Sequence, residues 1–255
     1  MQIIFEKNKS YLGDCLDLMP QMESGMFDMI LCDLPYGTTA CKWDTIIPFD
    51  KLWEQYTRLI KPNGAIVLFG QEPFSSLLRN SNLRDYKYDW YWQKERITNV
   101  FQVKRRAGKV IEPISVFYKQ QPTYNYEKTK HNGALVKNKP AGKHTKTSAL
   151  NELKVTPYND DGTRYPIQLL KFNRDLTYKH ETQKPIALVE YLIRTYTNEG
   201  ELILDNCAGS GTTGEAAHNT NRNYIQIEKE RKYFDCILGR EKSFNKKDNQ
   251  QALLL

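Results

Sequence analysis

Residues 27–37 read Phe-Asp-Met-Ile-Leu-Cys-Asp-Leu-Pro-Tyr-Gly, an apolar run that ends in a carboxylate, a proline and an aromatic ring. The run at 27–32 predicts a buried strand. A proline restricts the residue before it to extended conformations, which fixes the direction of that residue's carbonyl. A carboxylate, a fixed carbonyl and an aromatic ring at the tip of a strand suit the clamping of a flat base that bears an amine. The candidate catalytic residues are therefore Asp33, Leu34, Pro35 and Tyr36.

A second stretch, residues 202–213, reads Leu-Ile-Leu-Asp-Asn-Cys-Ala-Gly-Ser-Gly-Thr-Thr and predicts a strand, a glycine turn and the start of a helix. With Gly214 it matches the pattern Gly-x-Gly-x-x-Gly, and Glu228 follows at the end of the next expected strand. Glycines let the backbone approach a ligand, and such a carboxylate accepts hydrogen bonds from ribose hydroxyls. The candidate cofactor-binding residues here are Asp205, Asn206, Ala208, Gly209, Gly211, Thr212, Thr213 and Glu228.

Two cofactors suit this block, a nicotinamide dinucleotide (NAD) and S-adenosylmethionine (SAM). Asp205 precedes the glycines, where an acid suits the positive charges of SAM and would be unhelpful beside a pyrophosphate. Only about 40 residues follow the turn, so the remaining strands must come from the N-terminal half, an order that dehydrogenases rarely show. No hydride-transfer acid/base pair is evident. These features favour SAM over an NAD-dependent oxidoreductase.

The rest of the chain alternates strand-like and helix-like segments, which predicts a mostly parallel α/β sheet covered on both faces. We expect Asp14 and Asp50 to cap helices, Pro62-Asn63-Gly64 to form a turn, and the tail from Lys242 to be frayed. Expected strands are residues 3–5, 10–12, 27–32, 65–69, 86–92, 114–118, 202–205 and 223–228. Expected helices are residues 14–19, 51–60, 74–78, 185–196, 212–219 and 230–240.

Composition excludes several classes of protein. Hydrophobic residues make up 40% of the 255 residues and charged residues 26%, as expected for a globular protein that is not disordered. No apolar run approaches the roughly 20 residues that span a bilayer, and no signal peptide is evident, so we expect a cytoplasmic protein without a membrane partner. Five cysteines without a Cys-x-x-Cys pair read as reduced thiols, and scattered histidines predict no metal site.

Positive charge is concentrated in the middle of the chain. Residues 101–185 hold 17 Lys and Arg against 7 Asp and Glu, whereas the rest of the chain holds 20 against 23. Such an excess attracts a phosphate backbone, although a solvated surface is the plainer interpretation of charge alone. Together with the two blocks, it favours nucleic acid as the partner.

The two blocks in this order resemble the β class of SAM-dependent DNA amino-methyltransferases, which carry the catalytic block first and the SAM block last. That family usually has Asp-Pro-Pro-Tyr where this chain has Asp33-Leu34-Pro35-Tyr36. Leucine keeps the carbonyl and loses one proline's rigidity, so we expect the chemistry to survive. The similarity is closest to short phage and prophage adenine methyltransferases. It implies a Rossmann-like sheet with permuted motif order and a small basic recognition insertion.

The resemblance also implies further cofactor-binding residues and a division of the chain. The stretch 180–185 is similar to the motif that closes over the methionine end of SAM, which adds Thr182, Gln183 and Lys184. The turn at Asp14 and Cys15 is similar to the one near the SAM adenine. The implied domains are residues 1–118 as the catalytic half, 119–175 as the target-recognition insertion, 176–241 as the SAM-binding half and 242–255 as a polar tail.

The activity implied is methylation of the N6 amine of adenine in double-stranded DNA after base flipping. Methylation of cytosine N4 stays open, because Asp at the first clamp position resembles the adenine enzymes only by tendency. Cytosine ring-carbon methylation is set aside, since it uses a cysteine that usually follows a proline and this chain has none. More remote alternatives are a non-catalytic DNA-binding protein and the oxidoreductase. The family implies a possible homodimer and a possible restriction-modification partner in the bacterial or phage-infected cytosol.

Overall fold

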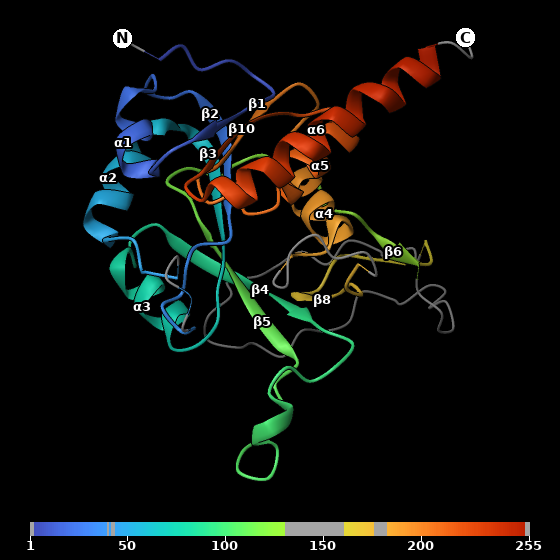
Figure 1. Ribbon diagram of the computed structural model, residues 1–255. Coiled ribbons are helices and arrows are strands. Elements are labelled where there is room, and N and C mark those ends of the chain that lie inside the picture. The colour runs from blue at the N-terminus through green and yellow to red at the C-terminus, as the bar shows by residue number, and fades with distance from the viewer. Residues whose placement is uncertain (1–2, 40, 42–43, 131–160, 176–182, 253–255) are drawn as a thin grey trace, which may run out of the picture. The chain divides into compact units, whose positions relative to one another are not determined.

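The computed structural model describes residues 3–39, 41, 44–130, 161–175 and 183–252, with side chains up to residue 244. The chain forms two compact units, one made of Met1–Asn125 with Gln168–Leu255 and the other of Tyr126–Ile167. The larger unit carries the main sheet and both sequence blocks (Figure 1). None of the helices in these described ranges is long and apolar enough to cross a membrane.

The main sheet has eight strands, and the first five are parallel to one another. The fold runs antiparallel at β5, which pairs with β3 on one side and β4 on the other, and β8 then lies parallel to β4. In spatial order the strands are β1 (Lys9–Leu12), β10 (Asn223–Glu228), β9 (Leu202–Asp205), β2 (Phe27–Cys32), β3 (Ile60–Phe69), β5 (Ile111–Phe117), β4 (Tyr86–Gln93) and β8 (Leu169–Lys171).

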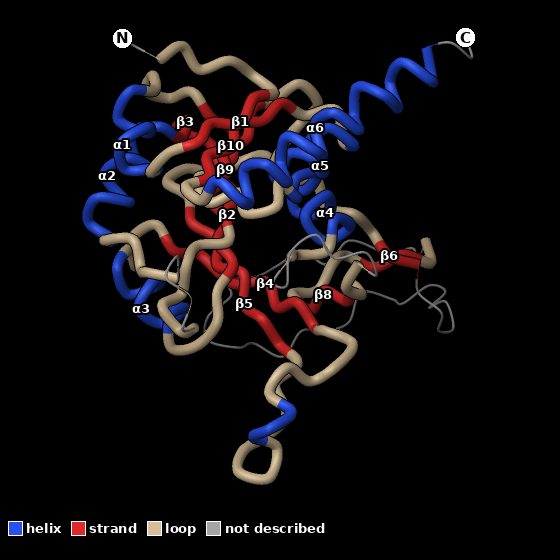
Figure 2. Tube along the Cα trace, in the orientation of Figure 1, coloured by secondary structure: helices blue, strands red, loops and turns tan. Residues whose placement is uncertain are grey.

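This order confirms the permuted Rossmann-like sheet. The two C-terminal strands, β9 and β10, lie between β1 and β2 from the N-terminal part of the chain (Figure 2). The C-terminal SAM block and the N-terminal clamp therefore stand at the ends of adjacent parallel strands, β9 and β2. Residues more than 170 positions apart in sequence share one edge of the sheet as a result.

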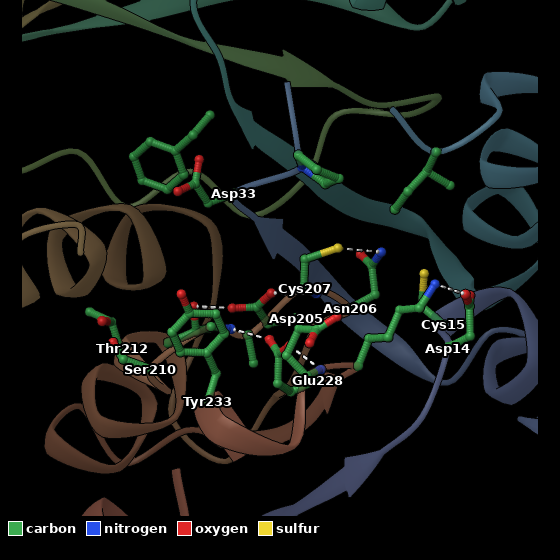
Figure 3. Close-up of a pocket in the computed structure, with 18 of the residues that line it drawn as sticks. Asp14, Cys15, Asp33, Asp205, Asn206, Cys207, Ser210, Thr212, Glu228 and Tyr233 are labelled. Carbon is green, nitrogen blue, oxygen red and sulfur yellow. Dashed lines mark hydrogen bonds and ion pairs between the residues drawn. The ribbon is translucent and has the colours of Figure 1, made fainter. Parts of the chain in front are cut away.

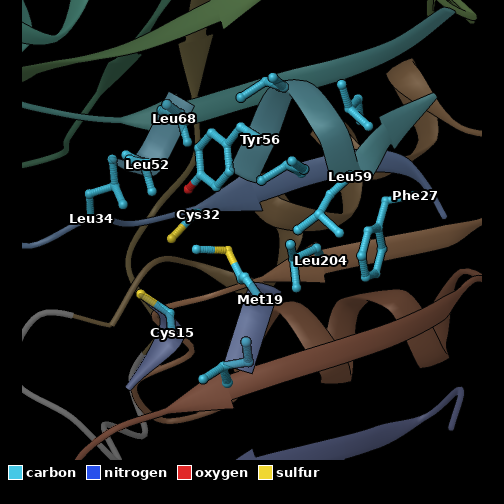
Figure 4. Packing of buried hydrophobic residues seen from close by; sticks show 14 of the residues in the cluster. Cys15, Met19, Phe27, Cys32, Leu34, Leu52, Tyr56, Leu59, Leu68 and Leu204 are labelled. Carbon is cyan, nitrogen blue, oxygen red and sulfur yellow. The ribbon is translucent and has the colours of Figure 1, made fainter. Parts of the chain in front are cut away.

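Helices bury both faces of the sheet, which explains the continuous apolar strands. Phe27, Ile30 and Cys32 of β2 join a cluster with α1 (Cys15–Leu18), α2 (Phe49–Leu59) and α3 (Phe74–Ser81). Met29 and Leu31 join the cluster on the opposite face, with α4 (Ile186–Tyr196) and α5 (Thr212–Asn219). Figure 4 shows the first cluster, in which helical side chains meet those of β2. The last helix, α6, spans Arg231–Ala252.

Some local predictions hold and others are wrong. Asp14 caps α1 as predicted, accepting a hydrogen bond from the Leu16 N–H at 2.9 Å. Asp50 is not a cap, because α2 begins at Phe49 after Pro48, and the acid lies in the first turn, where it still favours the helix dipole. The predicted strand at residues 3–5 does not form, and α6 continues through the tail expected to be frayed.

The predicted turn at residues 62–64 is also wrong, because these residues belong to β3. Gly64 is needed there for packing: a Cβ atom would lie 2.7 Å from the Ile60 side chain and 2.8 Å from the Asp28 carbonyl oxygen. The glycine that suggested a turn is therefore required by close packing within β3 and against Asp28.

The smaller unit contains a two-stranded ladder of β6 (Thr129–Lys130) and β7 (Thr163–Arg164). Lys128 pairs with Asp161 at 3.0 Å, and the Tyr126 and Tyr165 rings lie 5.0 Å apart. This unit falls inside the predicted recognition insertion and is narrower than residues 119–175. Many of the insertion's lysines lie outside the described residues, so its recognition role stays a prediction.

Candidate active site

A cavity of about 310 Å³ opens at the carboxyl ends of the parallel strands (Figure 3). Such a crevice is where open α/β sheets bind their ligands, and its volume is in the range of small-molecule sites. The cavity is lined by the segments that follow β1, β2, β9 and β10, by the end of β3, and by Gln183, Lys184 and Val189 around the start of α4. Both sequence blocks therefore contribute to one site.

Most of the predicted site residues line this cavity. They are Asp14, Cys15, Asp33, Pro35, Gln183, Lys184, Asp205, Asn206, Ala208, Gly209, Thr212, Thr213 and Glu228. Three others do not line it, namely Leu34, Tyr36 and Gly211. Thr182 lies outside the described residues.

Asp205 is a buried carboxylate at the end of β9. It accepts hydrogen bonds from the Thr213 hydroxyl at 2.6 Å and from the Cys207 N–H at 3.1 Å. Burial raises the pKa of Asp205 to about 6, although these hydrogen bonds act in the opposite direction. A nearby cation stabilises the charged form of a buried carboxylate, so Asp205 is suited to bind a cationic ligand.

Glu228 and the glycine turn form the neighbouring wall. The Glu228 carboxylate accepts from the N–H groups of Gly209 and Glu230, both at 2.7 Å, and burial raises its pKa. Gly209 and Gly211 both have positive φ, +55° and +82°, which side-chain-bearing residues rarely adopt. Gly211 is the N-cap residue of α5 and packs on Ile237, so its contribution is to the turn itself.

Asp14 and Cys15 close the cavity from the β1 side. Besides capping α1, Asp14 pairs with Lys229 at 2.9 Å. Burial works to raise the pKa of Asp14, but Lys229 and the Leu16 N–H outweigh it and the pKa is lowered. The thiols of Cys15 and Cys207 both line the cavity, and the described residues contain no disulfide.

Asp33 stands at the tip of β2 with a partly exposed side chain. One carboxylate oxygen accepts from the Tyr36 hydroxyl and the other from the Lys184 ammonium at 2.5 Å. The Tyr36 ring packs against Phe74 with 5.0 Å between centroids. Leu34 is buried in the core, which anchors the clamp backbone.

The sequence analysis missed the partner that holds Lys184. Glu112 of β5 is buried and pairs with Lys184 at 3.0 Å and with Lys94 at 2.6 Å. Burial alone would lower the pKa of Lys184, but Asp33 and Glu112 raise it above its ordinary value. Burial likewise would raise the pKa of Glu112, but Lys184 and Lys94 lower it. The only signal in the sequence for this partner was a single acidic residue, Glu112, within the otherwise apolar β5.

Two further residues position the site. Asp44 accepts from the backbone N–H groups of Gly37, Thr38 and Thr39 at 2.7–2.9 Å and so fixes the loop after the clamp. The buried Arg240 of α6 pairs with Glu215 and donates to Gln183 at 2.6 Å. Because Arg240 engages the Gln183 carbonyl, that side chain helps to join α6 to the cavity wall.

Among the described residues, no group of three or more His, Cys, Asp or Glu side chains is arranged to hold a metal ion.

The sequence profile of the DNA methylase family matches residues 27–239, which include both blocks. The chain belongs to the DNA methylase family. The match starts at β2 and ends within α6, so it covers the clamp, the Glu112 strand and the cavity wall except the segment after β1.

Several family members are similar over most of the chain. The DNA adenine methyltransferase YhdJ of Escherichia coli K12 is 26% identical over 89% of this chain and 80% of its own length. Type II methyltransferase M2.MboI of Moraxella bovis is 26% identical over 88% of this chain and 84% of its own. Type II methyltransferase M.HinfI of Haemophilus influenzae is 24% identical over 95% of this chain and 70% of its own.

Solved structures agree with the fold. The M1.HpyAVI–SAM complex is 25% identical, with a TM-score of 0.60 over 91% of this chain and 98% of that one. The PvuII DNA methyltransferase, which is cytosine-N4-specific, has a TM-score of 0.67 over 95% and 91% at 16% identity, and it supports the fold alone.

Proposed function

We propose that this protein is a SAM-dependent DNA methyltransferase that modifies the N6 amine of adenine in double-stranded DNA. The observation that carries the proposal is the pairing of the Asp33 clamp with the Asp205–Glu228 cavity at the ends of adjacent strands. The similarity to the DNA adenine methyltransferase YhdJ supports the choice of base. The family match leaves no support for the NAD-dependent oxidoreductase.

The cavity fits SAM by the chemistry of its walls. Asp205 offers a carboxylate to the positively charged methionine end, and Glu228 offers one to ribose hydroxyls. Ile46, Ile47 and Tyr233 supply apolar surface for the adenine ring. When bound, SAM supplies an electrophilic methyl group.

The clamp suits an exocyclic amine, whose lone pair is delocalised into the ring. Acceptors that hold the amine hydrogens favour the tetrahedral nitrogen formed during transfer. Asp33 supplies one acceptor and the Leu34 carbonyl is the natural second. The Lys184 ammonium donates to Asp33 at 2.5 Å, and a carboxylate offers acceptors only. No covalent enzyme intermediate is required.

Both oxygens of Asp33 already accept one hydrogen bond, but each has a second lone pair, so the carboxylate can still accept from a base amine. Lys184 is also held by Glu112, whereas the Tyr36 hydroxyl has Asp33 as its partner. In this proposal the amine bonds the Asp33 oxygen that faces Tyr36, and the Tyr36 ring stacks on the flipped base. The nitrogen would attack the methyl group as the sulfur–methyl bond of SAM breaks, which leaves the neutral thioether S-adenosylhomocysteine. The methylated nitrogen then gives up one proton, for which Asp33 is the acceptor in this proposal.

The direct test is incubation with methyl-labelled SAM and unmethylated duplex DNA, followed by nucleoside identification. Labelled N6-methyladenine is the expected product. Label on N4 of cytosine would establish the alternative base with the same clamp residues. SAM binding without any methylated base would favour a non-catalytic DNA-binding protein or a different substrate.

SAM affinity should depend on pH through Asp205. Only the ionised carboxylate attracts a cation, so the Kd for SAM should rise by about tenfold for each pH unit below about 6. In the protein without SAM, this carboxyl binds more protons in the folded than in the unfolded state between pH 3.8 and about 6. Its contribution to the free energy of unfolding therefore falls as pH rises through that window.

Calorimetric titration of SAM at several pH values between pH 5 and pH 7 measures how the Kd changes across the pKa of Asp205. Asp205→Asn should bind SAM weakly and with little change across this range. An equally steep dependence in Asp205→Asn would assign the titration to another group.

The relatives come from bacteria, which supports an action on DNA in the bacterial cytosol. The homodimer and the pairing with a restriction enzyme stay predictions. Light scattering of the purified protein tests the former.

A further inference from the structure

The connection between β4 and β5, residues 94–110, is a projecting hairpin that we call the arm (Figure 1). Lys94 N–H donates to the Val110 carbonyl at 2.8 Å, and Thr98 N–H donates to the Lys109 carbonyl at 2.9 Å. The Asn99 side chain closes the loop by bonding the Ala107 carbonyl and the Lys109 N–H. The arm is therefore a hydrogen-bonded structure that extends beyond the sheet.

The tip of the arm exposes large apolar side chains. Phe101 is fully exposed, at 102% of its reference area, and Val100 is exposed to 56%. Ile97 and Val103 are exposed as well. A cluster of apolar side chains held in water on a structured projection is characteristic of a surface that a partner covers.

The charge of the arm indicates which partner. Six of its 17 residues are Lys or Arg and one is acidic, and that acid, Glu95, pairs with Arg174 at 2.8 Å. Lys104, Arg105 and Arg106 follow Phe101 closely and are all exposed. Basic side chains around an exposed aromatic ring suit a polyanion that also offers flat apolar surface, which is nucleic acid.

The two strands that carry the arm also carry contacts to the clamp. Lys94, at the start of the arm, pairs with Glu112, which pairs with the Lys184 that contacts Asp33. At the other end, Lys109 donates to Gln71 at 2.7 Å, and Gln71 donates to Thr38 at 2.7 Å in the loop after Tyr36. DNA bound at the clamp would therefore lie close to the arm.

We infer that the arm binds duplex DNA beside the target base, with Lys104, Arg105 and Arg106 on phosphates and Phe101 against the base stack. This inference rests on the proposed DNA substrate. Flipping a base loses stacking, and an apolar side chain inserted at a base step offsets that loss. The arm is thus a second DNA-binding element, separate from the predicted recognition insertion.

The test compares two arm variants with matched variants elsewhere. Phe101→Ala should raise the Kd for a labelled mixed-sequence duplex by about tenfold, the usual effect of losing one aromatic–base contact. The triple variant K104Q/R105Q/R106Q should reduce the slope of log Kd against log salt by about 2 to 3, as loss of three phosphate contacts requires. Leu83→Ala and K7Q/K9Q/K51Q remove exposed side chains outside the arm and should bind as the wild type does.

SAM affinity, measured in parallel, should be unchanged in every variant, which excludes misfolding as the cause of weaker DNA binding. Duplex binding by both arm variants that equals the wild type overturns the inference. Unchanged duplex binding with lost binding to phosphatidylglycerol vesicles would assign the arm to a membrane surface instead. If the wild type binds duplex through the arm but methylates no base, the proposed function fails while the arm's role stands.

Discussion

Replacing Asp33 with asparagine should lower the rate of adenine methylation by about a thousandfold, the scale on which removing a group that stabilises a transition state acts. The asparagine side chain keeps the shape of the aspartate but carries an amide nitrogen with two donors, whereas the substrate amine needs acceptors. Asp33 also pairs with Lys184, so the substitution removes one of the two carboxylate charges that Lys184 faces. Single-turnover formation of N6-methyladenine measures the effect.

SAM affinity separates loss of chemistry from loss of the fold. The Asp205 and Glu228 contacts do not involve Asp33, so the Kd for SAM should stay within about threefold of the wild-type value. Asp50→Asn, at an exposed carboxylate in the first turn of α2, is the matched control and should retain full activity. A variant of Asp33 that methylates at more than about a tenth of the wild-type rate would mean that this carboxylate is not the main acceptor.

The sequence allowed the two ends of the active site to be predicted because each is a contiguous block. β2 with its clamp and β9 with its glycine turn both carry local signals: an apolar run, then residues with particular backbone requirements. The small number of residues after the glycine turn also constrained the order of the strands. These local signals predicted an α/β sheet and the two blocks. The permuted motif order and the cavity residues Asp14, Cys15, Gln183 and Lys184 came from the family resemblance.

Interactions between distant residues could not be predicted in the same way. Glu112 and Lys184 are 72 positions apart, and only the antiparallel placement of β5 beside β3 brings the acid under the clamp. A turn was predicted at Gly64 because of the Pro-Asn-Gly sequence. The glycine is instead required because Ile60 and Asp28 leave no room for a side chain. Asp44 holds the loop after the clamp through three backbone hydrogen bonds, which depend on the path of that loop and leave no local signal in the sequence.

Removing the charge of Lys184 should destabilise the protein as well as slow the reaction. The Lys184 side chain is 10% exposed and lies between two carboxylates, Asp33 and Glu112. Lys184→Met would leave both acids facing one another without the intervening cation. Loss of one member of a buried ion pair costs about 3–5 kcal/mol, and because Asp33 is partly exposed we expect about 3 kcal/mol, measured by urea unfolding at pH 7.5.

A double-mutant cycle with Glu112→Gln tests whether the pair itself is responsible. In Glu112→Gln the Lys184 ammonium keeps Asp33 as a partner, so the single variant Lys184→Met should be the more damaging one at the clamp. The double variant Lys184→Met/Glu112→Gln should be at least about 1 kcal/mol more stable than the sum of the single effects predicts. Additive effects would show that the two residues stabilise the protein independently. Leu77→Ala, at an exposed position on α3, controls for a general loss of side-chain contacts.

The dependence of stability on pH tests whether the interaction between Lys184 and Glu112 is electrostatic. The pKa of Glu112 is lowered in the folded state, so its contribution to stability is present above its ordinary pKa of 4.5 and is lost as pH falls. The pKa of Lys184 is raised, so its contribution is present below 10.5 and is lost only at strongly alkaline pH. Both contributions are therefore complete near neutrality. In Lys184→Met, Glu112 loses the main cation that lowers its pKa and takes up a proton at higher pH than in the wild type, so the stability difference should shrink as pH falls from 7.5 towards 5. A difference that stays constant over this range would attribute the loss to packing of the lysine stem, and the charge bridge from Glu112 to Asp33 would then not be what holds the clamp.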